Sequence, residues 1–259
     1  MNHSLSNIHP EAKIGSNVVI EPFVTIEKDV VIGDDTWIGS HVSIMNGARI
    51  GKNCKIYQGA VISGVPQDLK FRGEKTLTEI GDNTTIREYV TISRGTAEKH
   101  LTRVGSRVLL CAYVHIGHDC IVGDNCIFSN SVQLAGHVEV DNFAVFGGAS
   151  AVHQFVRVGA HVMIAGGSLV RKDVPPFTVA AREPLSYAGI NSVGLRRRGF
   201  SNDQINEIQE IYRYIFQKGL NNSKALDMVQ VECPPSHERD VIVNFIRQSD
   251  RGVMKGYKA

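Results

Sequence analysis

An aliphatic residue recurs at every sixth position through the first two thirds of this 259-residue chain. The series begins at Ile8 and ends at Val170, and only Asp68, Glu74 and Glu98 interrupt it. A small or β-branched residue stands two places before most members of the series, so each repeat has the two inward positions of a short strand. Glycine often opens the following turn, where unusual dihedral angles are needed. A fixed short period of this kind indicates a solenoid.

This repeat resembles that of the hexapeptide-repeat proteins, whose coils contain three hexapeptides, or about 18 residues each. The resemblance implies an all-β, left-handed parallel β-helix, which we expect over residues 1–175 with inserted loops at 64–79 and 94–103. Inserts in a solenoid tend to project and to carry function. If the repeat keeps its phase through the second insert, Glu98 lies one coil below Ile116, and the insert lies beside the corner that follows.

The chain beyond the repeat changes character. Prolines cannot donate to a sheet ladder, so the ladder is expected to stop at Pro175 and Pro176, with a connecting loop over 176–190. A small α-helical domain is expected over 191–259, because helical apolar stripes and caps appear there. Its helices are expected to start near Ser201, Ser223 and Ser236.

Composition excludes several classes of function. The net charge is +2, without the clustered basic stripe that is typical of nucleic-acid binding. No stretch of about 18 apolar residues and no signal-peptide pattern is present, so no membrane span and a cytoplasmic location are expected. The five cysteines include no Cys-x-x-Cys pair, which argues against a disulfide framework and a zinc ribbon.

One outward column of the predicted prism becomes apolar in its upper coils, and such a face on a prism needs a cover. Self-association as a homotrimer is the expected cover, and the C-terminal segment is the alternative. Stacking by 18 residues predicts that the column contains Val19, Trp37, Lys55, Thr91, Leu109, Ile127, Val145 and Met163.

The candidate chemistry lies in the stretch from His115 to Cys120. Stacking by 18 residues places Gly136 above His118, and Gln154 above Gly136, all in corners outside the packed interior. His118 could act as a general base on a hydroxyl group, and the Gly136 N–H could stabilise an oxyanion. The same stacking places His137 above Asp119. These residues predict an acyl-transfer site.

Two further readings of polar residues were weighed. Zinc bound by three histidines occurs in γ-class carbonic anhydrases, which share the repeat. Here His115 lies on a strand face and His118 at a corner, so their side chains diverge and no metal is predicted. The run Arg196–Arg198 near Asn191 favours a phosphate site, because guanidinium groups bind phosphate bidentately. A solvated basic cluster and a surface for an acidic carrier protein are the alternatives.

Five motifs make the chain resemble the UDP-N-acetylglucosamine 3-O-acyltransferases, and the resemblance extends over the full length. The motifs are Gln67-Asp68-Leu69-Lys70, His115-Ile116-Gly117-His118-Asp119-Cys120, Leu134-Ala135-Gly136-His137-Val138, Ala151-Val152-His153-Gln154-Phe155 and Arg197-Arg198-Gly199-Phe200.

The resemblance implies transfer of a fatty acyl group, expected to be 3-hydroxylated, from acyl carrier protein to the sugar 3-hydroxyl, the first step of lipid A synthesis. His118 would be the base, Asp119 its partner and Gly136 the oxyanion donor. The carrier's thioester is the donor, so no cofactor is implied. The implied substrate-binding residues are Asp68, Lys70, His115, His137, His153, Gln154, Asn191, Arg197 and Arg198, and those of the acyl groove are Met163 and Gly166.

Two positions depart from the usual family pattern. Val193 replaces an acidic residue near the nucleotide, and Ala112-Tyr113 replaces Asn-Ala. The alternatives are another hexapeptide acyltransferase or acetyltransferase, and a non-catalytic trimeric scaffold. The sequence gives neither the acyl length nor the choice between a 3-hydroxyl and a 3-amino sugar.

Overall fold

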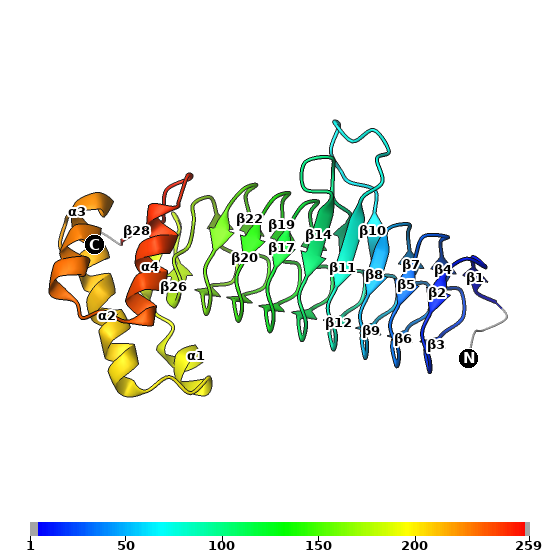
Figure 1. Ribbon diagram of the computed structural model, residues 1–259, viewed down its shortest axis with the longest axis horizontal. Coiled ribbons are helices and arrows are strands. Elements are labelled where there is room, and N and C mark those ends of the chain that lie inside the picture. The colour runs from blue at the N-terminus through cyan, green and yellow to red at the C-terminus, as the bar shows by residue number, and fades with distance from the viewer. Residues whose placement is uncertain (1–4, 257–259) are drawn as a thin grey trace.

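The computed structural model describes residues 5–256, which form a long three-sided prism of stacked coils with a helical domain at one end (Figure 1). Each coil contributes one short strand to each of three sheets, and coil-to-coil pairing within the prism is parallel. We call these sheets 1, 2 and 3 in the order in which the chain first enters them. The predicted parallel β-helix is therefore present.

Sheet 1 contains β1 (Asn7–Ile8), β4 (Thr25–Ile26), β7 (Ser43–Ile44), β10 (Val61–Gly64), β13 (Thr91–Ser93), β16 (His115–Ile116), β19 (Gln133–Leu134), β22 (Ala151–Val152) and β25 (Leu169–Val170). Sheet 2 contains β2 (Lys13–Ile14), β5 (Val31–Ile32), β8 (Ala48–Ile50), β11 (Leu77–Ile80), β14 (Leu101–Val104), β17 (Ile121–Val122), β20 (Glu139–Val140) and β23 (Arg157–Val158). Sheet 3 contains β3 (Val19–Ile20), β6 (Trp37–Ile38), β9 (Lys55–Ile56), β12 (Thr85–Ile86), β15 (Leu109–Leu110), β18 (Ile127–Phe128), β21 (Val145–Phe146), β24 (Met163–Ile164), β26 (Thr178–Ala181), β27 (Ser186–Ile190) and β28 (Lys255–Gly256).

The repeat builds the core directly, because its aliphatic positions stack on one another inside the prism. Ile116 lies beside Leu134 in the ladder, and both are fully buried. Cys54, Cys120 and Cys126 occupy the small inward position and are buried and unpaired, as expected. Each fully buried aliphatic side chain contributes about 1.5–3 kcal/mol, so the long column dominates the stability of the prism.

The two inserts are shorter than predicted, because strands extend into their ends. The loops that leave the prism are 65–76 and 94–100, and both project from its upper edge in Figure 1. They lengthen one coil from 18 residues (Gln133 minus His115) to 30 (Thr91 minus Val61) and to 24 (His115 minus Thr91). Both additions are multiples of six, so the aliphatic series continues in phase.

Two stacking predictions fail for the same reason. The residue beneath Ile116 is Ile92 rather than Glu98, and the residue beside Lys55 in sheet 3 is Thr85 rather than Thr91. A count by 18 cannot place residues across a coil that has 24 or 30. The prediction that the second insert lies beside the next corner is nevertheless confirmed, since Thr96 contacts Asp119.

The segment 176–190, expected as a connecting loop, instead contains the strands β26 and β27. β26 pairs in parallel with β24, and β27 returns antiparallel to β26. The ladder therefore continues past Pro175 and Pro176. Both prolines lie in a corner, where no ladder hydrogen bond requires an N–H, so they do not interrupt the sheet.

The helical domain was predicted in outline. It contains α1 (Ser192–Arg197), α2 (Asn202–Phe216), α3 (Asn222–Glu232) and α4 (His237–Arg247). Ser201 and Gln204 form the expected capping box at the start of α2. The short α1 was missed, because its sequence has no apolar stripe. Tyr212 of α2 is fully buried and donates to the Pro176 carbonyl oxygen at 2.6 Å, which joins the domain to the prism.

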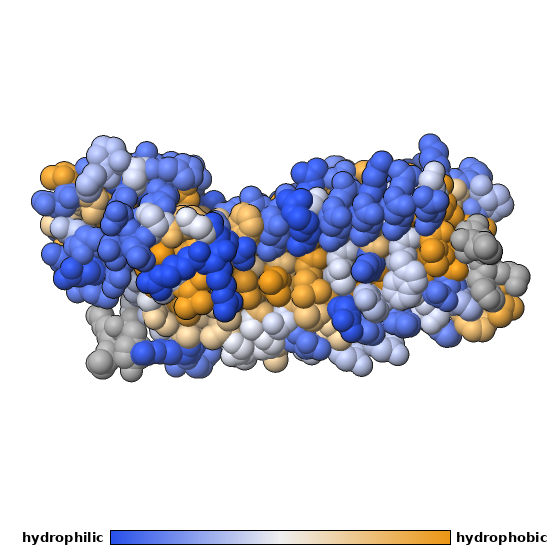
Figure 2. Space-filling view, turned by 90° about the horizontal axis from the view of Figure 1, so that it is seen from below, coloured by the Kyte–Doolittle hydropathy of each residue, from blue (hydrophilic) through white to orange (hydrophobic). Residues whose placement is uncertain are grey.

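The outward column of sheet 3 is apolar at the predicted coils. Register pairs Leu109, Ile127, Val145 and Met163 in succession. Ile127 remains 37% exposed. Figure 2, which shows the face that carries sheet 3, has a hydrophobic area along the middle of the prism. Among residues 5–256, no helix is long and apolar enough to cross a membrane.

Candidate active site

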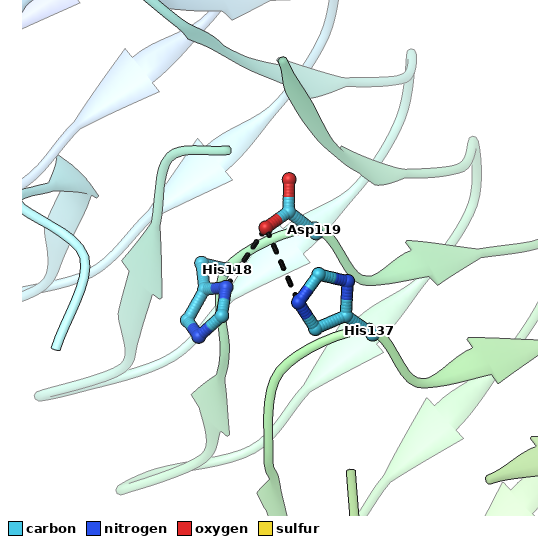
Figure 3. A group of neighbouring side chains, drawn as sticks. All are labelled: His118, Asp119 and His137. Atoms are coloured by element: carbon cyan, nitrogen blue, oxygen red, sulfur yellow. Dashed lines mark hydrogen bonds and ion pairs between the residues drawn. The ribbon is translucent and has the colours of Figure 1, made fainter. Parts of the chain in front are cut away.

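His118 and Asp119 lie in the corner between sheets 1 and 2, directly after β16. Asp119 adopts a φ of 59°, which turns the chain and brings its carboxylate back beside the preceding side chain. His118 Nδ1 lies 2.8 Å from Asp119 Oδ2 (Figure 3). When Nδ1–H donates to this carboxylate, the lone pair lies on Nε2. The dyad thus presents Nε2 as a proton acceptor.

The Asp119 carboxylate is fully buried and accepts several hydrogen bonds from the second insert. Thr96 donates its N–H to Oδ1 at 2.9 Å and its hydroxyl to Oδ2 at 2.6 Å, and the Lys99 N–H lies 3.3 Å from Oδ1. Burial alone would raise the pKa of Asp119, but hydrogen bonds from Thr96 and His118 outweigh it and hold the pKa below its ordinary value. The carboxylate therefore stays ionised beside the imidazole.

Gly136 stacks on the ring of His118, as the 18-residue spacing predicts. A Cβ at this position would lie 2.6 Å from both Cε1 and Nε2 of the ring, so only glycine leaves room for it. Within residues 5–256, no acceptor is hydrogen-bonded to the Gly136 N–H. The site therefore combines a proton acceptor with an unpaired backbone donor next to it, which are the two elements that acyl transfer needs.

His137 lies above Asp119, as predicted. Its Nε2 is 3.7 Å from Asp119 Oδ2 and 3.5 Å from Glu98 Oε2, and its N–H donates to the His118 carbonyl oxygen at 2.9 Å (Figure 3). Its ring stacks on Phe155 at 4.4 Å. Burial lowers the pKa of His137, although the charges of Asp119 and Glu98 oppose the shift. His137 is therefore neutral near pH 7.

The remaining predicted sugar-binding residues lie around this corner at different depths. His115 lies on the outer face of sheet 1, where its Nδ1 is 2.8 Å from Thr91 Oγ1, and burial lowers its pKa. His153 and Gln154 are exposed one coil beyond Gly136. The structure places them on the same edge of the prism as His118, without direct contact to it.

Asp68 and Lys70 lie in the loop 65–76, which rests on the second insert. Glu74 accepts a hydrogen bond from the Ala97 N–H at 3.1 Å, and the Arg94 guanidinium lies over the Phe71 ring at 5.3 Å. Asp68 accepts from the Lys70 N–H at 2.9 Å. The two loops therefore form one projecting unit next to Asp119.

The predicted phosphate-binding residues lie at a different corner, between sheets 2 and 3. Asn191 caps α1 and donates from Nδ2 to the His161 carbonyl oxygen at 2.9 Å. Arg198 lies over the Phe143 ring at 4.5 Å, whereas Arg197 is exposed. Within one chain, sheet 2 separates these residues from His118. The structure therefore does not bring the two parts of the predicted site together in a single copy.

The predicted acyl-groove residues lie along sheet 3 and the corner that follows it. Met163 is half-buried in β24, and Gly166 is exposed in the corner between sheets 3 and 1. Gly148 lies one coil below Gly166, and a Cβ on Gly166 would lie 3.2 Å from the Gly148 carbonyl oxygen. Glycines on successive coils thus keep this corner low.

The sequence analysis missed Thr96, Glu98 and Lys99 as neighbours of the dyad, since nothing in the sequence of the insert shows where its backbone turns. His118, Asp119 and His137 each offer a ligand atom within 4.8 Å of the others. The Asp119 oxygens already accept from Thr96 and His118. This arrangement suits a hydrogen-bonded dyad, and the absence of a metal stays a prediction.

Two family models match the chain. The model described as UDP N-acetylglucosamine O-acyltransferase, domain 2, matches residues 173–254, and the bacterial transferase hexapeptide model matches 29–64 and 101–136. The acyl-[acyl-carrier-protein]–UDP-N-acetylglucosamine O-acyltransferase of Thermodesulfovibrio yellowstonii is 44% identical over 254 residues, which is 98% of each chain.

Solved structures agree. The UDP-N-acetylglucosamine acyltransferase of Bacteroides fragilis is 52% identical and superposes with a TM-score of 0.97, covering 98% of this chain and 100% of that one. The enzyme of Francisella novicida is 41% identical, with a TM-score of 0.96 and coverage of 98% and 94%. The chain belongs to the acyl-[acyl-carrier-protein]–UDP-N-acetylglucosamine O-acyltransferase family.

Proposed function

We propose that this chain transfers a 3-hydroxylated fatty acyl group from acyl carrier protein to the 3-hydroxyl of UDP-N-acetylglucosamine, the first step of lipid A synthesis. The observation that carries the proposal is the buried His118–Asp119 dyad, whose Nδ1 and Oδ2 atoms lie 2.8 Å apart, next to the unpaired Gly136 N–H. The names of its relatives, which cover nearly the whole chain, supply the substrates.

In the proposed reaction, His118 Nε2 takes the proton of the sugar hydroxyl as its oxygen attacks the thioester carbonyl carbon. The carbonyl electrons move to oxygen, and the Gly136 N–H donates to this oxyanion. When the C–O double bond re-forms, the C–S bond breaks, and the imidazolium returns its proton to the leaving thiolate. The ionised Asp119 stabilises the imidazolium throughout, as the aspartate of a catalytic triad does.

The donor supplies all the activation that this reaction needs. A thioester carbonyl is already reactive toward an alkoxide, so the proposal includes no cofactor. Around the dyad, His115, His137 and Gln154 are proposed to bind the sugar, with His153 at the outer edge. Asp68 of the projecting unit is proposed to contact the sugar, and Lys70 the carrier or its pantetheine arm.

We propose that the working form is a homotrimer. Two observations support this. Sheet 3 carries an apolar column that includes Ile127, and Asn191 and Arg198 lie at a different corner from His118. In a closed ring, one copy can place this corner beside the dyad of the next. Asn191, Arg197 and Arg198 of that copy would then hold the diphosphate, and the corner at Gly166 with Met163 would hold the acyl chain.

Left-handed coiling, which the hexapeptide repeat implies, is part of the same proposal. The cytoplasmic location expected from the sequence remains a prediction.

The test is transfer by purified protein from acylated carrier protein to UDP-N-acetylglucosamine. Wild-type protein should transfer, and His118→Ala should lose about 10²–10⁴ in rate. Activity with acetyl-CoA and none with acylated carrier would contradict the donor assignment. Transfer by His118→Ala within about tenfold of wild type would exclude His118 as the base. Carriers that bear chains of different length, with and without a 3-hydroxyl group, would define the donor.

A further inference from the structure

The second insert makes its closest polar contacts with one buried group, the carboxylate of Asp119. Thr96 donates to both carboxylate oxygens, at 2.9 Å from its N–H and at 2.6 Å from its hydroxyl. Thr96 is itself 7% exposed, and Asp119 is fully buried. A buried carboxylate with two donors from one residue has a fixed orientation, because rotation about its side-chain bond would break both hydrogen bonds.

The insert is held in place on both sides. Lys99 Nζ forms an ion pair with Glu139 of β20 at 2.8 Å, and the Ala97 N–H donates to Glu74 of the first insert at 3.1 Å. The repeat without this insert would have no residue in the position of Thr96, since the strands on either side continue the ladder. The six additional residues therefore bring a hydroxyl group to a carboxylate that the β-helix alone would leave exposed on this side.

We propose that Thr96 is a positioning residue for the His118 base and acts through the carboxylate of Asp119. This inference rests on the proposed function. The Thr96 hydroxyl lies on Oδ2, which is the same oxygen that contacts His118 Nδ1. It therefore sets both the direction of that oxygen and the amount of negative charge available to the imidazole.

Loss of the hydroxyl should have two effects. The carboxylate becomes free to turn away from Nδ1, which lowers kcat without changing substrate contacts. A carboxylate that has lost a donor is also less stabilised as an anion. It therefore attracts the imidazolium proton more strongly, and the dyad holds this proton to a higher pH. The acid limb of kcat/KM should move upward in pH.

Other titratable groups face the dyad and stay in place when Thr96 changes. His137 comes from the next coil, His115 from sheet 1, and Glu98 and Lys99 from the insert itself. None of them donates a hydroxyl to the carboxylate. The direction of the shift is therefore assigned to Thr96.

The experiment compares Thr96→Val, which keeps the shape, with Thr96→Ser, which keeps the hydroxyl. Thr96→Val should lower kcat about 10- to 100-fold, the value of one hydrogen bond to a charged group. KM for both substrates should stay within about twofold, because Thr96 touches neither. Thr96→Ser should recover kcat to within about threefold of wild type. Thr96→Ala, made in parallel, removes the same hydroxyl if the valine variant does not fold.

Thr84→Val is the matched control. Thr84 is also fully buried, and its hydroxyl donates to the Gly105 carbonyl oxygen at 2.8 Å, away from the dyad. This variant should lose stability yet keep the wild-type pH profile. In addition, Thr96→Val made on an Asp119→Asn background should cause no further loss, because the group through which it acts is already changed.

The outcomes separate the two proposals. If wild-type protein does not transfer, or His118→Ala stays active, the proposed function is wrong. If wild-type protein transfers and His118→Ala does not, the role of Thr96 is tested on its own. A wild-type kcat and acid limb in Thr96→Val, or an equal loss of rate with and without Asp119, would overturn it.

Discussion

Gly136→Ala is the sharpest test of the site, because the structure shows what one added methyl group must meet. The new Cβ would lie 2.6 Å from Cε1 and Nε2 of His118, where ordinary van der Waals contact begins near 3.4 Å. The ring must therefore move by about 1 Å. A displacement of this size in a catalytic group costs about 10²-fold.

The displacement also strains the 2.8 Å contact between His118 Nδ1 and Asp119, so kcat should fall about 100-fold or more. Stability should change little in comparison, since the ring lies at the rim of a corner and 6% of it is exposed. The assay is steady-state acyl transfer, with circular dichroism and thermal unfolding to confirm the fold.

Gly64→Ala is the control substitution. A Cβ on Gly64 would meet nothing closer than Val61 Cγ1 at 3.7 Å, an ordinary contact. This variant should keep kcat within about twofold of wild type. A Gly136→Ala variant with kcat within about threefold of wild type would refute the reasoning, since the ring would then have room that the structure does not show.

Three further predictions concern stability and assembly. Ile116→Ala, in the fully buried column, should lower the free energy of unfolding by about 2–5 kcal/mol in chemical denaturation, and a loss below about 1 kcal/mol would contradict the packing. Burial, assisted by the charge of Arg198, lowers the pKa of His161 from 6.5 to about 4. The unfolded chain therefore binds a proton below pH 6.5 that the folded chain refuses until about pH 4. Stability should consequently fall as the pH drops through this window, and His161→Phe should flatten the profile. Ile127→Glu should break the proposed trimer in sedimentation experiments, and an unchanged mass would show that this face is not the interface.

Most of the prism followed from local sequence. The six-residue series placed Ile116 and Leu134 inside, and the 18-residue spacing placed Gly136 on His118 and His137 above Asp119. These predictions succeed because a solenoid repeats one short unit, so sequence distance translates directly into spatial distance. They fail where the coil changes length, as with Thr85 in sheet 3.

The Asp119 environment was beyond the reach of the sequence. Thr96 reaches the carboxylate through a loop whose path depends on contacts with Glu74 and Glu139, both distant along the chain. The strands at 178–181 and 186–190 escaped prediction as well, because the corner that makes Pro176 harmless to the ladder exists only in the folded chain.

The sequence by itself determined the solenoid, its inward columns, the corner that holds the dyad and the resemblance to a family. Those features depend on periodicity, which is a property of the chain alone. Only the tertiary structure decided that Thr96 orders Asp119, and that Asn191 and Arg198 lie at another corner from His118. Such relations depend on where loops and domains come to rest, and packing between distant segments sets those positions.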